Sequence, residues 1–443
     1  MVRLPIVTGL AALTAILSTS VSHAQTEIDW WHSMGGELGT KLEAIVAGFN
    51  TSQTEYAVTP VYRGEYEESM VGTIAAFRAN EQPVLVQVYE VGTGTMMAAQ
   101  GAVYPVYELM ADTGQEFDPQ AFLPAVVGYY TDTEGNMLSM PFNSSTPILY
   151  YNKAAFEEAG LDPETPPKTW AEVEEFSNKI LESGAAECGF SMGYAASWIG
   201  IENFSAWHNQ PLGTLENGFG GLGTELTFNG EVQARFWDDL KRWSDAGIFR
   251  YAGPAGGPDS NPSFYSGTCA MVMNSSASRA GILANVEGFD VGFGMLPYYD
   301  DVEGAPQNSI IGGATIWVLQ GHSDEEYEAA AAFLDYLSSP EVQADWHQST
   351  GYLPITDAAY ELSQEQDYYE QNPGADTSIK QITLNPPTEN SKGLRFGNFP
   401  QIRLILDEQL EAVLAGDKTG QEALDTAVQQ GNQILRDFEA SNS

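Results

Sequence analysis

Hydrophobic and polar residues follow two spacings in the first part of the chain after an N-terminal apolar stretch. Short apolar runs that end in glycine-containing turns are typical of buried strands, whereas the apolar positions Leu42, Ile45, Val46 and Phe49 have the spacing of a helix face. The pattern predicts strands at residues 27–32, 56–62 and 84–89 and helices at 42–49 and 67–78. This alternation of strands and helices predicts a parallel, doubly wound α/β sheet.

A second series of strands and helices begins near residue 147 and indicates a second sheet. Two helix starts carry the capping-box pattern, at Thr169 with Glu172 and at Thr419 with Glu422. Strands are expected at 147–151, 269–273, 289–293 and 314–319, and helices at 173–181, 232–243, 325–337 and 419–438. We find no internal repeat, and the glycine- and proline-rich segment 253–262 is expected to be a surface loop.

The first 24 residues have the pattern of an export signal. Arg3 precedes an apolar run over residues 4–17, and a small-x-small pattern ends at Ala24, where we expect cleavage. The run of roughly 14 residues is shorter than the ~20 that a membrane-spanning helix needs. No cysteine follows it for lipid attachment, so we expect an exported protein of the periplasm.

The charge of the chain excludes several classes of partner. There are 60 acidic and 18 basic residues, a formal net charge of −42, which repels nucleic acids and anionic lipids. An anionic ligand therefore needs a local site with an arginine or convergent N–H groups. Even without the leader, the chain is longer than one hydrophobic core usually covers, which predicts two lobes.

The chain has two cysteines, Cys188 and Cys269. They form no C-x-x-C motif and no cluster with histidine, so neither a zinc site nor a redox motif is predicted. Export to an oxidising compartment favours a disulfide between them, and two buried free thiols are the alternative.

Several motifs of catalysis and of cofactor binding are missing. The chain has no P-loop and no H-E-x-x-H, and the acidic residues Asp300, Asp301 and Glu303 lack the spacing of a calcium loop. Among 60 acidic residues a pair of carboxylates for glycoside hydrolysis can always be chosen, and no motif selects one. We therefore expect a protein that is not an enzyme, with no catalytic residue, no cofactor and no metal.

Aromatic residues gather beside polar or glycine-rich turns at the predicted strand ends. They include residues 30–31, Tyr66, 194–198, Trp207 and Tyr352. Aromatic faces with a few directed polar groups suit a pocket for a small polyol or sugar, because C–H faces stack while hydroxyls form hydrogen bonds. Strand ends are also where ligand sites of α/β folds form.

Several long segments resemble one family along nearly the whole chain after the leader. They are WHSMGGELG, QVYEVGT, MPFNSSTPILYYNK, ENFSAW, APQNSIIGGATIWVLQG, WHQSTGYLPIT and KGLRFGNFPQIR. The chain resembles the extracellular solute-binding proteins of ABC importers, a maltose-binding-like group, and among them the glycerol-3-phosphate-binding receptors. The resemblance implies a periplasmic-binding-protein-like fold of two discontinuous α/β lobes joined by a hinge, with the ligand enclosed between them.

The resemblance also implies how the chain divides between the lobes. The N-lobe would comprise residues 25–139 and 297–350, and the C-lobe residues 140–296 and 351–443. The three crossings would fall near 140–143, 294–297 and 351–354. Such a receptor binds sn-glycerol 3-phosphate or glycerophosphodiesters such as glycerophosphocholine, and it stays monomeric until it docks on the inner-membrane ABC permease subunits.

Residue by residue, the resemblance implies seven ligand contacts. They are Tyr66, Glu90, Ser145, Ser276, Gly313, Tyr352 and Arg403. Arg403 offers a fork of donors to phosphate oxygens, the serines and the Gly313 N–H add neutral donors, and Glu90 can accept from glycerol hydroxyls. Trp198 is a possible stacking residue, and Tyr194 stands where the family pattern has a second tryptophan. Tyrosine gives a weaker cation–π surface, which weakens the expectation of a diester ligand.

Three other functions compete with this interpretation. A neutral oligosaccharide receptor of the same fold would have no reason to bury the Arg403 cation. An exported hydrolase of the same substrates would show turnover. A structural envelope protein is disfavoured because the chain has no anchor and no repeats.

Overall fold

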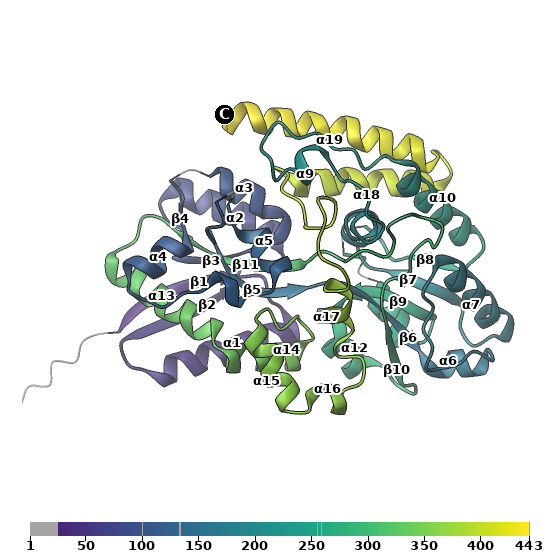
Figure 1. The fold of residues 1–443 in the computed structure, drawn as a ribbon, viewed down its shortest axis with the longest axis horizontal. Helices are drawn as coiled ribbons and strands as arrows, with labels where there is room; N and C mark the ends of the chain where they lie inside the picture. The colour runs from purple at the N-terminus through teal and green to yellow at the C-terminus, as the bar shows by residue number, and fades with distance from the viewer. Residues whose placement is uncertain (1–24, 100, 133, 255, 258, 443) are drawn as a thin grey trace, which may run out of the picture.

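The computed structural model describes residues 25–442 except residues 100, 133, 255 and 258. The predicted leader and its cleavage after Ala24 lie outside these residues. Within the described part of the chain, no helix combines the length and the apolar character that crossing a bilayer requires. The chain forms two β-sheets that lie side by side, each covered by helices (Figure 1).

The first sheet runs in the order β2-β1-β3-β11-β4, and β5 also pairs with β11. Its strands are β1 (Thr26–His32), β2 (Tyr56–Tyr62), β3 (Leu85–Tyr89), β4 (Val103–Tyr104), β5 (Met140–Ser145) and β11 (Gly312–Leu319). The helices around it are α1 (Gly36–Ser52), α2 (Tyr66–Ala79), α3 (Thr93–Ala98), α4 (Val106–Asp112), α5 (Pro124–Tyr130), α13 (Asp324–Ser338), α14 (Pro340–Thr350) and α15 (Asp357–Glu365). The apolar faces of these helices and the sheet enclose a core that includes Trp30, Phe142 and Phe333.

The second sheet runs in the order β10-β6-β9-β7-β8. Its strands are β6 (Pro147–Asn152), β7 (Cys188–Met192), β8 (Phe249–Tyr251), β9 (Cys269–Ser275) and β10 (Val291–Gly294). Its helices are α6 (Lys153–Glu158), α7 (Trp170–Ser183), α8 (Phe204–Trp207), α9 (Thr214–Asn217), α10 (Glu231–Asp245), α11 (Ser260–Tyr265), α12 (Arg279–Asn285) and α17 (Thr377–Ile382), and α16 (Tyr368–Gln371) precedes α17. The long helices α18 (Phe399–Ala415) and α19 (Gly420–Asn442) pair with each other and pack on α10 (Figure 1).

The two-lobed α/β architecture is confirmed, but the prediction of purely parallel sheets is wrong for two strands. β1, β2 and β3 are parallel, as are β7, β8 and β9, whereas β11 runs antiparallel to β3 and β6 runs antiparallel to β9. β11 and β6 are the strands that enter each sheet from the other one. They arrive without the right-handed crossover helix that makes neighbouring strands parallel.

The chain changes from the first sheet to the second at Thr146, because β5 still pairs with β11 while β6 pairs with β9. The Thr146 hydroxyl lies 2.6 Å from Ser309 Oγ and donates to the Ile310 carbonyl at 3.1 Å, in the segment that leads back to β11. Gln381 of α17 donates to Ser309 Oγ at 3.0 Å and to the Pro147 carbonyl at 2.6 Å. These buried hydrogen bonds tie the connecting segments together. The division of the chain into lobes at the predicted residues stays a prediction.

The two cysteines form a disulfide, as predicted. Cys188 begins β7 and Cys269 begins β9, and the two residues face each other in the register of these parallel strands with a Cα–Cα distance of 4.6 Å. The bridge therefore joins two central strands of the second sheet.

Candidate functional site

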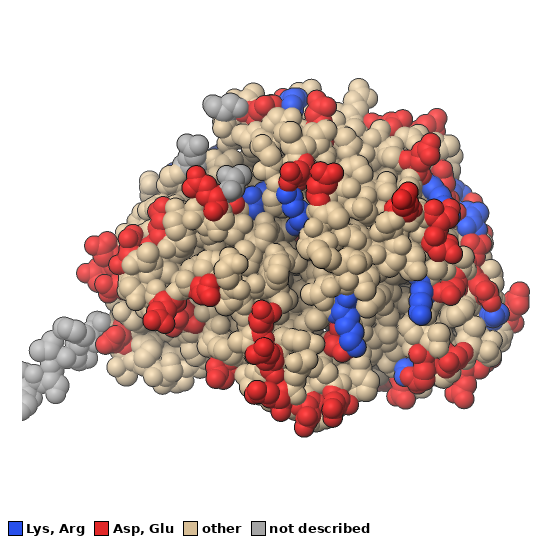
Figure 2. Space-filling view, viewed as in Figure 1, with Lys and Arg blue, Asp and Glu red and all other residues tan. Residues whose placement is uncertain are grey.

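A cavity of about 450 Å³ lies between the two sheets. Its walls come from segments that follow strands of both sheets: Gly35 after β1, Glu90 after β3, Tyr194 after β7, and residues 256–257 after β8. Side chains at strand ends converge there because parallel strands end at the same edge of a sheet. The face of the molecule shown in Figure 2 carries more acidic than basic side chains.

The structure brings most of the predicted site residues together in this cavity. The predicted residues that line it are Tyr66, Glu90, Ser145, Tyr194, Trp198, Gly313, Tyr352 and Arg403. Ser276 is the exception. It is buried and its Oγ lies 3.5 Å from the N–H of Thr146, while its neighbours Ser275, Ala277 and Ser278 line the cavity. The role of each residue toward a ligand stays a prediction.

Arg403 on α18 is the only lysine or arginine among the residues that line the cavity. Its guanidinium binds two carboxylates, one from each side. Nε and Nη2 donate to the two oxygens of Glu202 at 2.8 Å each, and Nη2 also donates to Glu90 at 2.7 Å. The side chains are almost completely buried, with exposures of 10% for Arg403, 6% for Glu90 and 0% for Glu202.

Burial and mutual charge set the protonation of this triad. Burial lowers the pKa of Arg403, but Glu202 and Glu90 together raise it well above its ordinary value, so the guanidinium stays charged. Burial raises the pKa of Glu90 to about 7, against the opposing effect of Arg403 and with the support of the Glu202 charge. Glu90 can therefore change protonation state near neutral pH, inside the site.

A chain of side-chain amides orients Tyr66 at the first-sheet wall of the cavity. The Gln87 amide donates to Asn143 Oδ1 at 2.7 Å, and the Asn143 amide donates to the Tyr66 hydroxyl oxygen at 3.0 Å. The Tyr66 ring stacks on Tyr89, with centroids 5.2 Å apart and planes 4° apart. Burial raises the pKa of Tyr66 well above its ordinary value, so its phenol keeps a hydrogen that it can donate to a ligand.

Tyr352 is placed by a buried histidine on α14. Burial lowers the pKa of His347 to about 4, so its imidazole is neutral and has one N–H. Nδ1 donates to the Tyr352 carbonyl at 2.5 Å, and Nε2 accepts from the Tyr369 hydroxyl at 2.9 Å. Both ring nitrogens are used, which fixes the backbone of Tyr352 at the cavity edge.

Two consecutive glycines start β11 beside the cavity. Gly313 has φ +95°, and a Cβ there would lie 1.8 Å from the Asn143 carbonyl oxygen, so no other residue fits. A Cβ on Gly312 would lie 2.3 Å from the ring of Trp198. Gly313 therefore allows the close approach of β11 to β5 within the first sheet, and Gly312 leaves room for the ring of Trp198, which follows β7 of the second sheet.

Trp198 and Glu202 belong to the same unusual element. Residues Trp198–Asn203 form a π-helix, η3, which begins four residues after Tyr194, a residue with φ +49°. The Tyr194 and Trp198 rings meet edge to face, with centroids 5.8 Å apart. π-Helices and non-glycine residues with positive φ are strained and concentrate at functional sites. This element supplies a wall of the cavity and a partner of Arg403.

Glu202 and Tyr89 carry no local pattern in the sequence that marks them as residues of the site. Glu202 lies within the ENFSAW segment, but its partner Arg403 is 201 positions away and no local pattern links them. Tyr89 ends a predicted buried strand and its partner Tyr66 starts a helix, so only the folded structure brings the two rings together. The unusual glutamate inside an apolar, aromatic segment was the one available signal.

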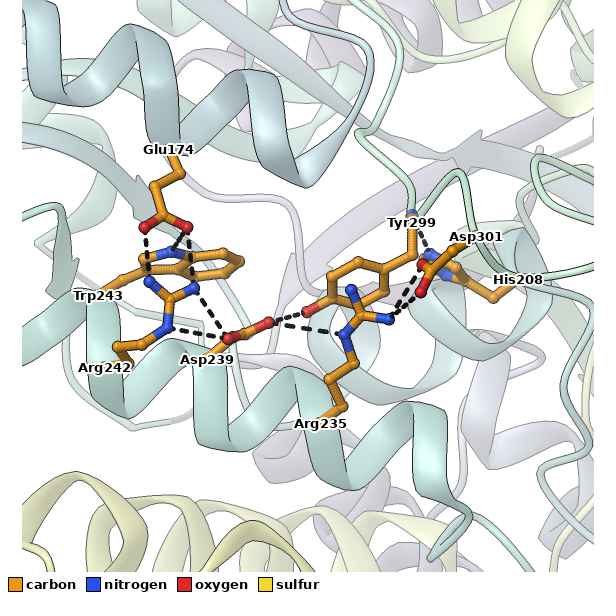
Figure 3. Close-up of polar contacts among 8 residues, drawn as sticks. All are labelled: Glu174, His208, Arg235, Asp239, Arg242, Trp243, Tyr299 and Asp301. Atoms are coloured by element: carbon orange, nitrogen blue, oxygen red, sulfur yellow. Dashed lines mark hydrogen bonds and ion pairs between the residues drawn. The ribbon is translucent and has the colours of Figure 1, made fainter.

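A second group of charged residues lies away from the cavity on α10 (Figure 3). Arg242 makes a fork with Glu174, at 2.6 and 2.8 Å, and also binds Asp239. Arg235 on α10 binds Asp301 at 2.8 Å, and Asp301 lies in an exposed loop. Among the described residues no group of three histidine, cysteine or acidic residues is placed to hold a metal ion.

Comparisons with known proteins agree with the architecture. Residues 44–377 match the model of the bacterial extracellular solute-binding protein family. The chain is 50% identical over 436 residues to the sn-glycerol-3-phosphate-binding periplasmic protein UgpB of Salmonella typhimurium, covering 98% of each chain. It is also 50% identical to UgpB of Yersinia pestis over 432 residues, covering 97% of each chain.

Two solved structures show the same fold. The structure of UgpB from Mycobacterium tuberculosis in complex with glycerophosphocholine has a TM-score of 0.77 and 22% identity, over 94% of this chain and 100% of that chain. Maltose-bound MalE3 of T. maritima has a TM-score of 0.74 and 16% identity, over 92% of this chain and 100% of that chain.

Proposed function

This chain belongs to the family of bacterial extracellular solute-binding proteins, and from that premise we propose that it is the periplasmic receptor of an ABC importer for sn-glycerol 3-phosphate or its diesters, such as glycerophosphocholine. It captures the solute between its two lobes and delivers it to the permease. Identity of 50% over nearly full length to UgpB proteins supports this ligand class.

The observation that carries the proposal is the single arginine of the cavity. A phosphate loses its water on entering, and this loss is unfavourable unless charged and neutral donors replace it. Arg403 supplies the cation, and the Ser145 hydroxyl and the Gly313 N–H are neutral donors in the same cavity. The net charge of −42 gives the protein a negative electrostatic potential that repels anions, and Arg403 supplies a positive charge within the cavity.

The remaining polar groups suit the glycerol part of the ligand. The Glu90 carboxylate can accept from hydroxyls, and Tyr66 and Tyr352 can each donate one hydrogen bond. Tyr194 and Trp198 offer aromatic faces to C–H groups or, more weakly at Tyr194, to a choline cation. The leader with cleavage after Ala24, a monomeric state until docking and the lack of nucleic-acid binding belong to the same proposal.

A neutral sugar receptor is the second candidate, because one observation favours it. Glu90 and Glu202 already pair with Arg403, and paired carboxylates and arginines can also bind sugar hydroxyls. In that case the cavity would need no phosphate to balance its charge.

Calorimetric titration of the purified protein separates these candidates. We expect saturable binding of sn-glycerol 3-phosphate or glycerophosphocholine, and no binding of maltose. Binding of maltose without binding of either phosphate ester would overturn the proposal. Incubation with glycerophosphocholine should release no choline, because the cavity holds a receptor site rather than a catalytic one.

A further inference from the structure

Arg403 can act on a phosphate only in an orientation that its neighbours impose. We propose that Glu202 is the positioning residue for the phosphate site: it fixes the guanidinium of Arg403 so that the remaining N–H groups serve the ligand, and it never touches the ligand itself. This inference rests on the proposed function, because it concerns the same phosphate site.

Counting donors shows what Glu202 leaves available. A guanidinium has five N–H donors. Glu202 occupies two of them, on Nε and Nη2, and Glu90 occupies the second hydrogen of Nη2. Among the described residues no hydrogen bond uses Nη1, so both of its hydrogens are left over. Glu202 binds the side of the guanidinium that carries Nε, and no described residue forms a hydrogen bond with the end that carries Nη1.

The two carboxylates of the triad have different access to a ligand. Glu90 lines the cavity from the end of β3, whereas Glu202 does not line it and its side chain has no exposed surface. A glycerol hydroxyl can therefore draw Glu90 away from Arg403. Nη2 then has a free hydrogen beside those of Nη1, and this pair of nitrogens can bind two phosphate oxygens.

Glu202 keeps Arg403 paired during this exchange. An arginine that lost its only carboxylate inside the protein would be a buried, uncompensated charge, which is costly. With Glu202 in place, Arg403 keeps a fork to one carboxylate, and its Nη1 hydrogens remain available to a ligand. The bidentate geometry also prevents rotation of the guanidinium plane, which a single hydrogen bond would allow.

The π-helix η3 holds the backbone of Glu202 in place. The Glu202 N–H donates to the Ser197 carbonyl at 3.0 Å. The next residue, Asn203, donates from its amide to the Trp198 carbonyl at 3.1 Å and accepts from the N–H of Ile310 at 2.9 Å. Asn203 is completely buried. The backbone that carries Glu202 is thus held both within η3 and by the segment that enters β11.

Two substitutions separate positioning from charge. Glu202→Gln removes a negative charge near the phosphate, which by itself would tighten binding of an anion. Loss of the fork has the opposite effect, and we expect about tenfold weaker binding of sn-glycerol 3-phosphate, within the range measured for coupled neighbours. Glu202→Asp keeps the charge but is one methylene shorter, and we expect weaker binding here too.

Glu174→Gln is the matched control, because Glu174 also forms a two-bond fork with an arginine, through Nη1 and Nη2 of Arg242 (Figure 3), and it does not line the cavity. It should leave the Kd unchanged. A second experiment measures the effect of Glu202→Gln on the Kd in the Arg403→Lys protein as well as in wild type. A merely structural role of Glu202 predicts the same effect in both proteins. If Glu202 acts through the guanidinium, the second substitution should change the Kd by less than about threefold in the lysine background.

The outcomes are distinct. Wild-type protein that fails to bind either phosphate ester refutes the proposed function. Wild-type binding with an unchanged or tighter Kd in folded Glu202→Gln refutes the positioning role. Should Glu202→Gln fail to fold by circular dichroism, an unchanged Kd in Glu202→Asp refutes it instead. Equal losses from Glu202→Gln in the arginine and lysine backgrounds would assign Glu202 a structural role only.

Discussion

Replacement of Arg403 is expected to lower both the stability of the protein and its affinity for the ligand, and the contacts of Arg403 give the size of each loss. Arg403→Ala removes three hydrogen bonds and leaves the carboxylates of Glu90 and Glu202 buried together without a cation. Removing one partner of a buried charge cluster typically destabilises a protein by about 3–5 kcal/mol. We expect a loss of this size in the free energy of unfolding.

Arg403→Ala should also weaken ligand binding, independently of its effect on stability. Loss of one partner of a buried charge pair costs about 2–5 kcal/mol of binding free energy, or roughly 30- to several-thousand-fold in Kd. Arg403→Lys keeps a cation for the two carboxylates but has no planar fork. We therefore expect Arg403→Lys to retain most of the stability while binding sn-glycerol 3-phosphate much more weakly than wild type.

Urea denaturation followed by circular dichroism and calorimetric titration measure the two effects. The expected order of affinity is wild type, then Arg403→Lys, then Arg403→Ala, whereas the expected order of stability places Arg403→Lys close to wild type. A folded Arg403→Ala protein that binds the phosphate ester within about threefold of wild type would refute the role given to this arginine, since that is under 1 kcal/mol.

Three further predictions follow from other contacts. Burial raises the pKa of Glu90 from 4.5 to about 7, so the folded state binds a proton that the unfolded state has lost. Its contribution to stability is present below pH 4.5 and is lost as the pH rises through about 7, and Glu90→Gln removes this dependence. The stability of wild type minus that of Glu90→Gln should therefore fall between pH 5 and pH 8, and a constant difference would contradict the shift. Replacing Cys188 and Cys269 by serine should lower the free energy of unfolding by about 2–4 kcal/mol, and protein from the periplasm should gain the mass of two hydrogens on reduction; an unchanged mass would exclude the bridge. Arg395 donates to the carbonyls of Gly128, Tyr129 and Thr131 at the end of α5, so Arg395→Ala should cost about 1–3 kcal/mol of stability in denaturation, and no loss would show that these bonds are weak.

The apolar patterns predicted the elements well, and the direction of two strands poorly. Helix faces such as Leu42 to Phe49 depend on residues that are close in sequence, and the spacing alone reveals them. The antiparallel pairing of β11 with β3 depends on where the chain enters the sheet. That entry is decided by buried contacts such as Thr146 with Ser309, which are 163 positions apart and leave no local pattern.

The candidate site shows the same division. The resemblance assigned the positions of Arg403 and Glu90, and the structure brings both side chains to the cavity, while their roles toward a ligand stay predictions. Glu202 was not predictable, because its function depends on a π-helix and on a partner in α18. The resemblance assigned Ser276 as a contact; its neighbours Ser275, Ala277 and Ser278 line the cavity, and the role of Ser276 toward a ligand stays a prediction.

A crystal structure of the protein with sn-glycerol 3-phosphate tests the central claim most directly, because it locates the phosphate. The account predicts phosphate oxygens within hydrogen-bonding distance of Arg403 Nη1, about 2.7–3.2 Å, with Glu202 still forked onto Nε and Nη2. Glu90 should then lie against a glycerol hydroxyl. A phosphate bound elsewhere, with Arg403 still shared between Glu90 and Glu202 as in the free protein, would contradict it.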